Sequence, residues 1–113
     1  MALEALWTVD FGAVAGGVIV LKGGQIFGGD GARYYVGTFT AKGTKLEGQL
    51  SIAWYFGPRK TVWGDEAKVV ETKVTGEVVG SDTITGNLTR AGYPVIPFHM
   101  TKRADLPPSS QDP

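Results

Sequence analysis

The sequence predicts an all-β protein, an antiparallel barrel of eight strands that follow one another as a meander. Apolar and polar side chains alternate along most of the chain, whereas helical periodicity is nowhere sustained. Turns that contain glycine interrupt the alternation about every ten residues, which is typical of barrels and sandwiches. Two hairpins also share one glycine pattern, and this pattern favours the sharp coiling of a closed barrel.

A chain of 113 residues has the size of a single domain with one modest core. Its hydrophobic residues, 42% of the total, are enough to fill such a core. We assign residues 1–104 to the barrel and residues 105–113 to a disordered tail, because this last stretch is rich in proline and serine. Without cysteine, stability must come from packing and from the hydrogen bonds of the sheet.

Eight segments have the composition and the alternation of strands. They are residues 6–11, 16–22, 25–28, 34–41, 45–56, 69–79, 83–89 and 95–103. Gly23 and Gly24 form a two-residue connection that accepts the positive φ angles of a tight hairpin. Residues 42–44 and 80–82 are also expected to be short hairpin turns, so that successive strands pair antiparallel.

The hairpin around residues 80–82 is a variant of the earlier hairpin around residues 42–44. With a three-residue loop at residues 80–82, the pairing places Gly76 opposite Gly86. Glycines that face each other on the concave side of a sheet let the strands coil sharply. The glycine pattern therefore predicts a closed barrel in preference to a flat sheet.

The faces of the central strands separate into an apolar and a polar side. In the fifth strand the apolar side consists of Leu46, Gly48, Leu50, Ile52 and Trp54, and in the seventh it consists of Ile84, Gly86 and Leu88. This separation is typical of a sheet with one face on the core and the other in water. Residues 57–68 break the alternation, and we expect a long, mobile loop there with at most one helical turn.

The sequence offers no recognisable catalytic constellation. Its single histidine, His99, is interpreted as a surface or barrel-rim residue, and the scattered carboxylates do not form a metal-ligand set. The glycine-rich residues 23–31 lack the lysine and hydroxyl of a phosphate-binding loop, so Asp30 is interpreted as an acceptor for nearby backbone amides. We predict neither an enzyme nor a cofactor.

Charge and hydropathy exclude two classes of partner. Eleven basic residues balance eleven acidic ones, so no overall field attracts nucleic acid, although basic and aromatic side chains lie together at residues 33–35 and 59–63. No apolar run approaches the roughly 20 residues that a membrane-spanning helix needs, and residues 1–7 carry no basic signal region. We therefore expect a cytoplasmic protein without a membrane span or a nucleic-acid partner.

Aromatic residues exceed what a very small core needs, so an interior cavity or an interface is expected to use some of them. Core filling accounts at least equally well for Trp7, Phe39 and Trp54, whose strand phase points inward. A carrier of a small apolar ligand would line its cavity with Phe39, Leu50, Ile52, Trp54, Val74 and Leu88. A protein-binding surface would instead include Lys42, Lys45, Tyr55 and Trp63.

Two motifs carry a resemblance to a known family. The segment Gly24-Gln25-Ile26-Phe27-Gly28-Gly29-Asp30 is followed by Tyr35-Val36-Gly37-Thr38-Phe39. In this order, and with the opening hairpin at residues 6–21, the chain resembles the GrlR-like family, small negative regulators of bacterial type III secretion. The resemblance extends loosely over the larger part of the chain.

The resemblance implies a lipocalin-like (calycin-type) barrel, usually a homodimer, that sequesters a protein partner such as a transcriptional regulator and has no catalytic residue. In the best-known enterobacterial members an acidic run occupies the turn after the Y-x-G stretch, whereas residues 41–45 here are neutral or basic. The chain is thus similar to the family in its scaffold and differs at this turn. Three functions stay open, in this order: a protein-binding regulator, a carrier of a small apolar ligand, and an enzyme.

Overall fold

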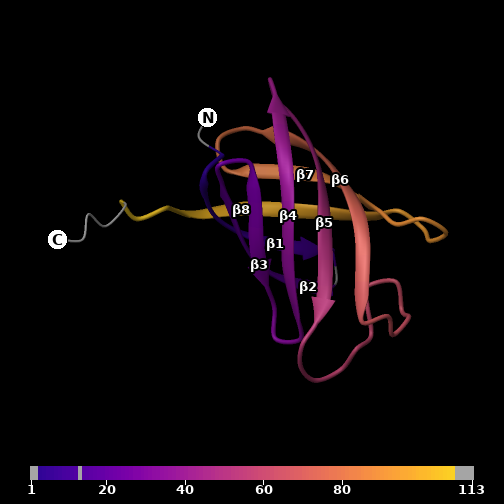
Figure 1. The fold of residues 1–113 in the computed structure, drawn as a ribbon. Helices are drawn as coiled ribbons and strands as arrows, with labels where there is room; N and C mark the ends of the chain where they lie inside the picture. Colours follow the sequence, from indigo (N-terminus) through magenta and orange to yellow (C-terminus); the bar gives the residue numbers. More distant parts are fainter. Residues whose placement is uncertain (1–2, 13, 109–113) are drawn as a thin grey trace.

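The computed structural model describes residues 3–12 and 14–108, and these residues form a closed antiparallel barrel (Figure 1). Each strand pairs with its neighbours in sequence, and β1 also pairs with β8, which closes the barrel. The strands are β1 (Ala5–Phe11), β2 (Val14–Lys22), β3 (Gln25–Gly29), β4 (Arg33–Lys42), β5 (Lys45–Trp54), β6 (Val69–Val79), β7 (Thr83–Thr89) and β8 (Ile96–Asp105). The predicted all-β, eight-stranded meander barrel is confirmed.

The strand bounds agree with the sequence prediction to within two residues. β5 ends at Trp54, earlier than predicted, because the amides of Tyr55 and Phe56 turn to the carbonyl oxygen of Ala32. β8 runs on to Asp105, which pairs with Ala5, so this residue belongs to the barrel and not to the predicted tail. Residues 109–113 of that tail lie outside the described residues.

The first hairpin turn has the backbone that its two glycines predict. Gly23 and Gly24 have φ angles of 58° and 75°, and both positive values belong to the tight turn whose twist matches the flanking strands. Lys22 pairs with Gln25 directly across this turn. The sequence therefore fixes the register of β2 and β3 locally.

The predicted pair of facing glycines is present, since Gly76 lies opposite Gly86 in the β6–β7 ladder. A Cβ atom at position 86 would lie 2.0 Å from the carbonyl oxygen of Thr75 and 2.8 Å from the Cα atom of Gly76. No side chain fits in that space. The close approach of the two backbones is what lets the wall curve at this point.

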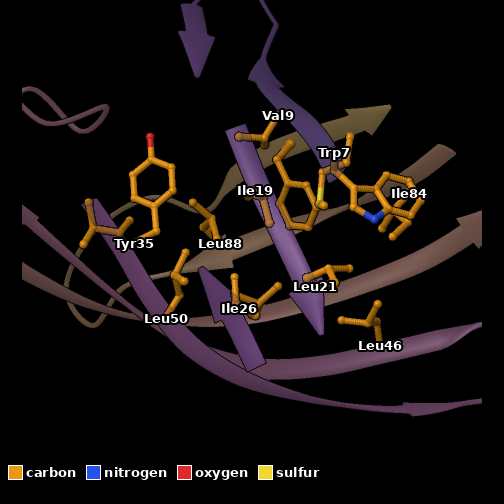
Figure 2. Packing of buried hydrophobic residues seen from close by; sticks show 14 of the residues in the cluster. Trp7, Val9, Ile19, Leu21, Ile26, Tyr35, Leu46, Leu50, Ile84 and Leu88 are labelled. Carbon is orange, nitrogen blue, oxygen red and sulfur yellow. The ribbon is translucent and has the colours of Figure 1, made fainter. Parts of the chain in front are cut away.

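One continuous apolar cluster fills much of the interior (Figure 2). Leu50 and Leu88 keep only 6% and 4% of their surface exposed, so the alternation assigned their faces correctly. Trp7 is fully buried, and its Nε1 donates a hydrogen bond of 3.0 Å to the carbonyl oxygen of Leu3. We refer to the side of the cluster around Trp7 as the closed end.

The segment between β5 and β6, residues 55–68, contains no helix or strand and loops away from the sheet in the lower part of Figure 1. This is the long loop that the sequence predicts. Within the described residues there is also no helix of the length and apolarity needed to cross a membrane.

Candidate ligand cavity inside the barrel

Side chains do not fill the interior completely. A cavity of about 210 Å³ remains within the barrel. Most of its wall is aliphatic or aromatic, as expected for side chains that alternate inward on every strand. Residues that form this wall include Leu50, Ile52, Val70, Val74, Leu88 and Phe98. Trp7 does not line the cavity, so the cavity does not extend through the closed end.

Four of the six residues predicted to line a cavity do so, namely Leu50, Ile52, Val74 and Leu88. Their strands β5, β6 and β7 are neighbours, and all four side chains are buried. In Figure 2, Leu50 and Leu88 lie near Tyr35, on the opposite side of the cluster from Trp7. The inward phase of these strands thus builds one coherent apolar wall.

Phe39 and Trp54 have the inward phase but do not line the cavity. Phe39 lies farther along β4 and packs, partly buried, against the core cluster. Trp54 is the last residue of β5, and its Nε1 donates a hydrogen bond of 2.9 Å to the carbonyl oxygen of Gly57 in the following loop. Alternation defines the face of a strand, whereas distance along the strand decides which inward residues reach the cavity.

The long loop covers the other end of the cavity, which we call the mouth. Lys60, Thr61, Val62 and Trp63 of this loop all line the cavity, and Thr61 is buried. They meet the first residues of β4 there, since Arg33 and Tyr35 line the same space. The mouth is therefore more polar than the wall.

Arg33 anchors the loop from within. Its guanidinium donates hydrogen bonds to the carbonyl oxygens of Arg59, Ala67 and Lys68, near both ends of the loop. These contacts hold a segment that the sequence predicts to be mobile. A guanidinium offers five donors in a fixed plane, so one side chain can hold several backbone carbonyls at once.

The Arg33 side chain is not fully satisfied by these contacts. The residue is only 5% exposed, and its Nε has no hydrogen-bond partner among the described residues. Within the same part of the chain it forms no ion pair with a carboxylate. A buried donor without a partner costs about 1–3 kcal/mol, and a buried charge without a counter-charge is also unfavourable.

Asp30 lies beside Arg33 at the mouth, but its carboxylate already accepts three hydrogen bonds. Its Oδ1 accepts from the backbone amides of Ala32 (2.7 Å) and Arg33 (2.8 Å), as the sequence predicts, and its Oδ2 accepts from the Tyr35 hydroxyl. Burial, and then this hydrogen bond to Asp30, raise the pKa of Tyr35 well above its ordinary range. Tyr35 is therefore a neutral hydroxyl at the cavity.

A second set of contacts ties the loop to the turn between β7 and β8. Arg90 donates to both carboxylate oxygens of Asp65, at 2.6 and 2.9 Å, and its guanidinium lies 3.6 Å from the ring centroid of Tyr93. Trp63 donates a hydrogen bond of 2.7 Å from Nε1 to the carbonyl oxygen of Pro94. The hydrogen bonds from Arg90 and Thr61 hold the pKa of Asp65 well below its usual range.

The four residues predicted as a partner surface do not form one surface. Lys42 and Lys45 pair with each other at the β4–β5 hairpin, whereas Tyr55 and Trp63 lie in the segment beyond the other end of β5. A strand of this length separates the two pairs by roughly 30 Å. Trp63 in fact lines the cavity, and Lys45 forms an ion pair of 2.8 Å with Glu77.

His99 lies on the outer surface and does not line the cavity. Its Nδ1 is 3.5 Å from Oδ2 of Asp10, and both side chains are about half exposed. Among residues 3–12 and 14–108, no three or more His, Cys, Asp or Glu side chains group closely enough to hold a metal ion.

The sequence interpretation named only part of the cavity wall, and among the residues that it missed are the polar ones Arg33, Lys60 and Thr61. A signal for Arg33 exists, since it has the same phase as Tyr35 on β4 and therefore points inward once the strand is extended by one residue. No periodic signal exists for the two loop residues. Their position follows from the tertiary contacts of the loop.

Comparison with known proteins adds no relative on which a function could be based. No protein-family model matches the chain, and no curated protein matches it.

Proposed function

We propose that this barrel binds a small apolar or amphiphilic molecule in its interior. The observation that carries the proposal is the cavity of about 210 Å³, whose wall is apolar and whose mouth is covered by a loop. Apolar pockets with a few polar groups at one end are the usual form of small-molecule sites. The preorganised wall favours burial of an alkyl or aromatic group, because water inside it would find few hydrogen-bond partners.

The cavity volume limits the size of the ligand. Drug-sized ligands occupy pockets of about 300–1,000 Å³, whereas an apolar cavity of about 150 Å³ accepts benzene. The cavity here falls between these limits. A medium-length alkyl chain or a small aromatic compound fits this range, and a long-chain lipid would have to extend through the mouth.

Filling the cavity tests the proposal. Val74→Phe adds volume at the wall, while Val36→Phe makes the same change on the outer face, where Val36 is 49% exposed. Isothermal titration of octanol is expected to detect binding to the native protein and to Val36→Phe, and to show strongly weakened binding to Val74→Phe. Circular dichroism would establish that both variants keep the β-barrel. Equal binding by all three proteins would contradict an interior site.

A protein-binding regulatory role is the second candidate, and an apolar strip on the outside of the barrel favours it. The strip crosses β2, β3 and β4 and consists of Val18, Phe27, Tyr34 and Val36, each 42–49% exposed. Phe27 pairs with Val36, and Gly29 lies between Val18 and Tyr34. Contiguous exposed apolar residues of this kind are typical of protein-binding surfaces.

We propose that this strip, and not the β4–β5 hairpin, contacts the protein partner in such a role. The resemblance to GrlR-like negative regulators supports a transcriptional regulator as the partner class. Phe27→Glu is expected to abolish the interaction with the partner, whereas Thr85→Glu, a change at an exposed position on β7, should not. Binding that survives Phe27→Glu would contradict the assignment of the strip. Comparison of the sedimentation of the native protein with that of Phe27→Glu would show whether the isolated protein self-associates through the same strip.

A further inference from the structure

We propose that the mouth of the cavity is a subsite for an anionic head group, so that the ligand is an amphiphile with a carboxylate or phosphate at one end. This inference rests on the proposed binding of a small molecule in the interior, and it names the ligand class. Its basis is the net positive charge at the mouth, together with the buried Arg33 Nε that has no partner among the described residues. Arg33 and Lys60 both line the cavity there.

Arg33 is the main group of this subsite. The side chain is 5% exposed, its guanidinium contacts only backbone carbonyls, and its Nε is without a partner in the described part of the chain. A guanidinium recognises carboxylates and phosphates through charge-assisted hydrogen bonds. An anionic ligand oxygen next to Nε would give this buried donor an acceptor and this buried charge a counter-charge.

The neighbouring carboxylate of Asp30 offsets only part of the positive charge at the mouth. Both oxygens of Asp30 already accept hydrogen bonds, from two backbone amides and from the Tyr35 hydroxyl. Asp65 does not line the cavity and is paired with Arg90. Lys60 adds a second positive charge on the loop side of the mouth. Two cations and one carboxylate therefore face the cavity, which leaves the mouth with a net positive charge.

The rest of the cavity suits a hydrocarbon tail. Leu50, Ile52, Val74, Leu88 and Phe98 form an apolar wall that leads from the mouth towards the closed end. In Figure 2 the Tyr35 hydroxyl lies on the side of the cluster opposite Trp7, which places polar and apolar groups at different ends. A ligand that is polar at one end and apolar along its length matches this polarity.

Three ligands of equal chain length test the head-group preference: octanoate, octyl phosphate and octanol. Isothermal titration against the native protein is expected to show at least about tenfold tighter binding for one or both anions than for the alcohol, which corresponds to one charge-assisted hydrogen bond. Preference for octanoate or for octyl phosphate would identify which anion the subsite takes. Octanol bound as tightly as both anions would overturn the anionic subsite while leaving the interior site intact. Failure of all three to bind would overturn the interior site itself.

Variants assign the effect to the mouth. Lys60→Gln changes an exposed loop residue and should weaken binding of the preferred anion about two- to fivefold, with octanol unaffected. Lys73→Gln removes the same charge from the exposed face of β6 and serves as the matched control. Arg33→Met should weaken anion binding at least about tenfold more than it weakens octanol binding, provided that circular dichroism shows an intact barrel. Unchanged anion binding in Lys60→Gln and in folded Arg33→Met would overturn the proposal.

Discussion

The two ends of the barrel are closed by different kinds of contact. At the closed end a fully buried tryptophan fills the interior, and its one polar atom is satisfied by Leu3 close by in the chain. At the mouth a loop is held by the carbonyl contacts of Arg33 and by the Asp65–Arg90 pair. The apolar packing around Trp7 keeps the closed end shut. Polar contacts of the second kind can be exchanged for water or ligand, so the mouth is the end that can open.

The largest difference between the ends is expected for their tryptophans. Trp7→Ala should lower the free energy of unfolding by about 3–5 kcal/mol, because it leaves a cavity in the packed end. Trp63→Ala at the mouth should cost clearly less, since Trp63 is only partly buried. Urea denaturation followed by circular dichroism measures both values. Equal losses would show that the mouth is as firmly packed as the closed end.

The wall between the two ends should be sensitive to added side-chain volume where the backbones of β6 and β7 approach closely, at Gly76 and Gly86. Gly86→Ala would place a Cβ atom against Thr75 and should destabilise the barrel by about 1–3 kcal/mol through overpacking. Gly31→Ala is the matched control, since a Cβ atom there meets no other atom within 4 Å. Urea midpoints would separate the two variants. An unchanged urea midpoint for Gly86→Ala would mean that β6 and β7 can move apart without a loss of stability.

A smaller effect is expected for the buried hydroxyl at the mouth. Tyr35→Phe removes the hydrogen bond to Asp30 and should cost about 1 kcal/mol at neutral pH. Because the folded state raises the pKa of Tyr35, its contribution is fully present below the ordinary tyrosine pKa of about 10 and is lost as the pH rises beyond it. The native protein should therefore lose stability above about pH 10 more steeply than Tyr35→Phe. The exposed Tyr34→Phe should leave that alkaline slope unchanged.

The smallest effect is expected for the ion pair on the loop. The pKa of Asp65 is lowered in the folded state, so its contribution is present above the ordinary carboxyl pKa of about 4 and is lost as the pH falls below it. The melting temperatures of the native protein and Asp65→Asn should differ at neutral pH and converge in acid. Glu66→Gln, an exposed neighbour on the loop, should match the native protein throughout. A gap that persists in acid would show that the Asp65 charge is not its cause.

Residues of the cavity wall could be predicted from the sequence, whereas most residues of the mouth could not. Leu50 and Leu88 could be assigned to the interior because side chains alternate between the two faces of a strand. The opposite phase would expose all apolar side chains of the strand to water. The same argument predicted the pairing of Gly76 with Gly86. These are local rules, since each depends only on neighbouring strands.

Positions along the barrel axis follow from strand stagger, which no local pattern encodes. For this reason Trp54 had the correct phase and yet lies where the loop begins, outside the cavity. The loop itself has no periodicity, so the position of Trp63 at the mouth depends on its contacts with the turn between β7 and β8. Arg33 was missed because a charged residue at a strand start is ordinarily assigned to the surface.

The pairing of β1 with β8 has a consequence for how this chain folds. Every other strand pair joins neighbours in sequence, so seven hairpins can form early from short segments. The last seam brings Ala5 to Asp105, across almost the whole length of the chain, and bears the largest loss of chain entropy. Until it forms, β1 and β8 expose unpaired backbone edges. We expect this late step to set the folding rate and to be the stage at which two molecules are most prone to join edge to edge.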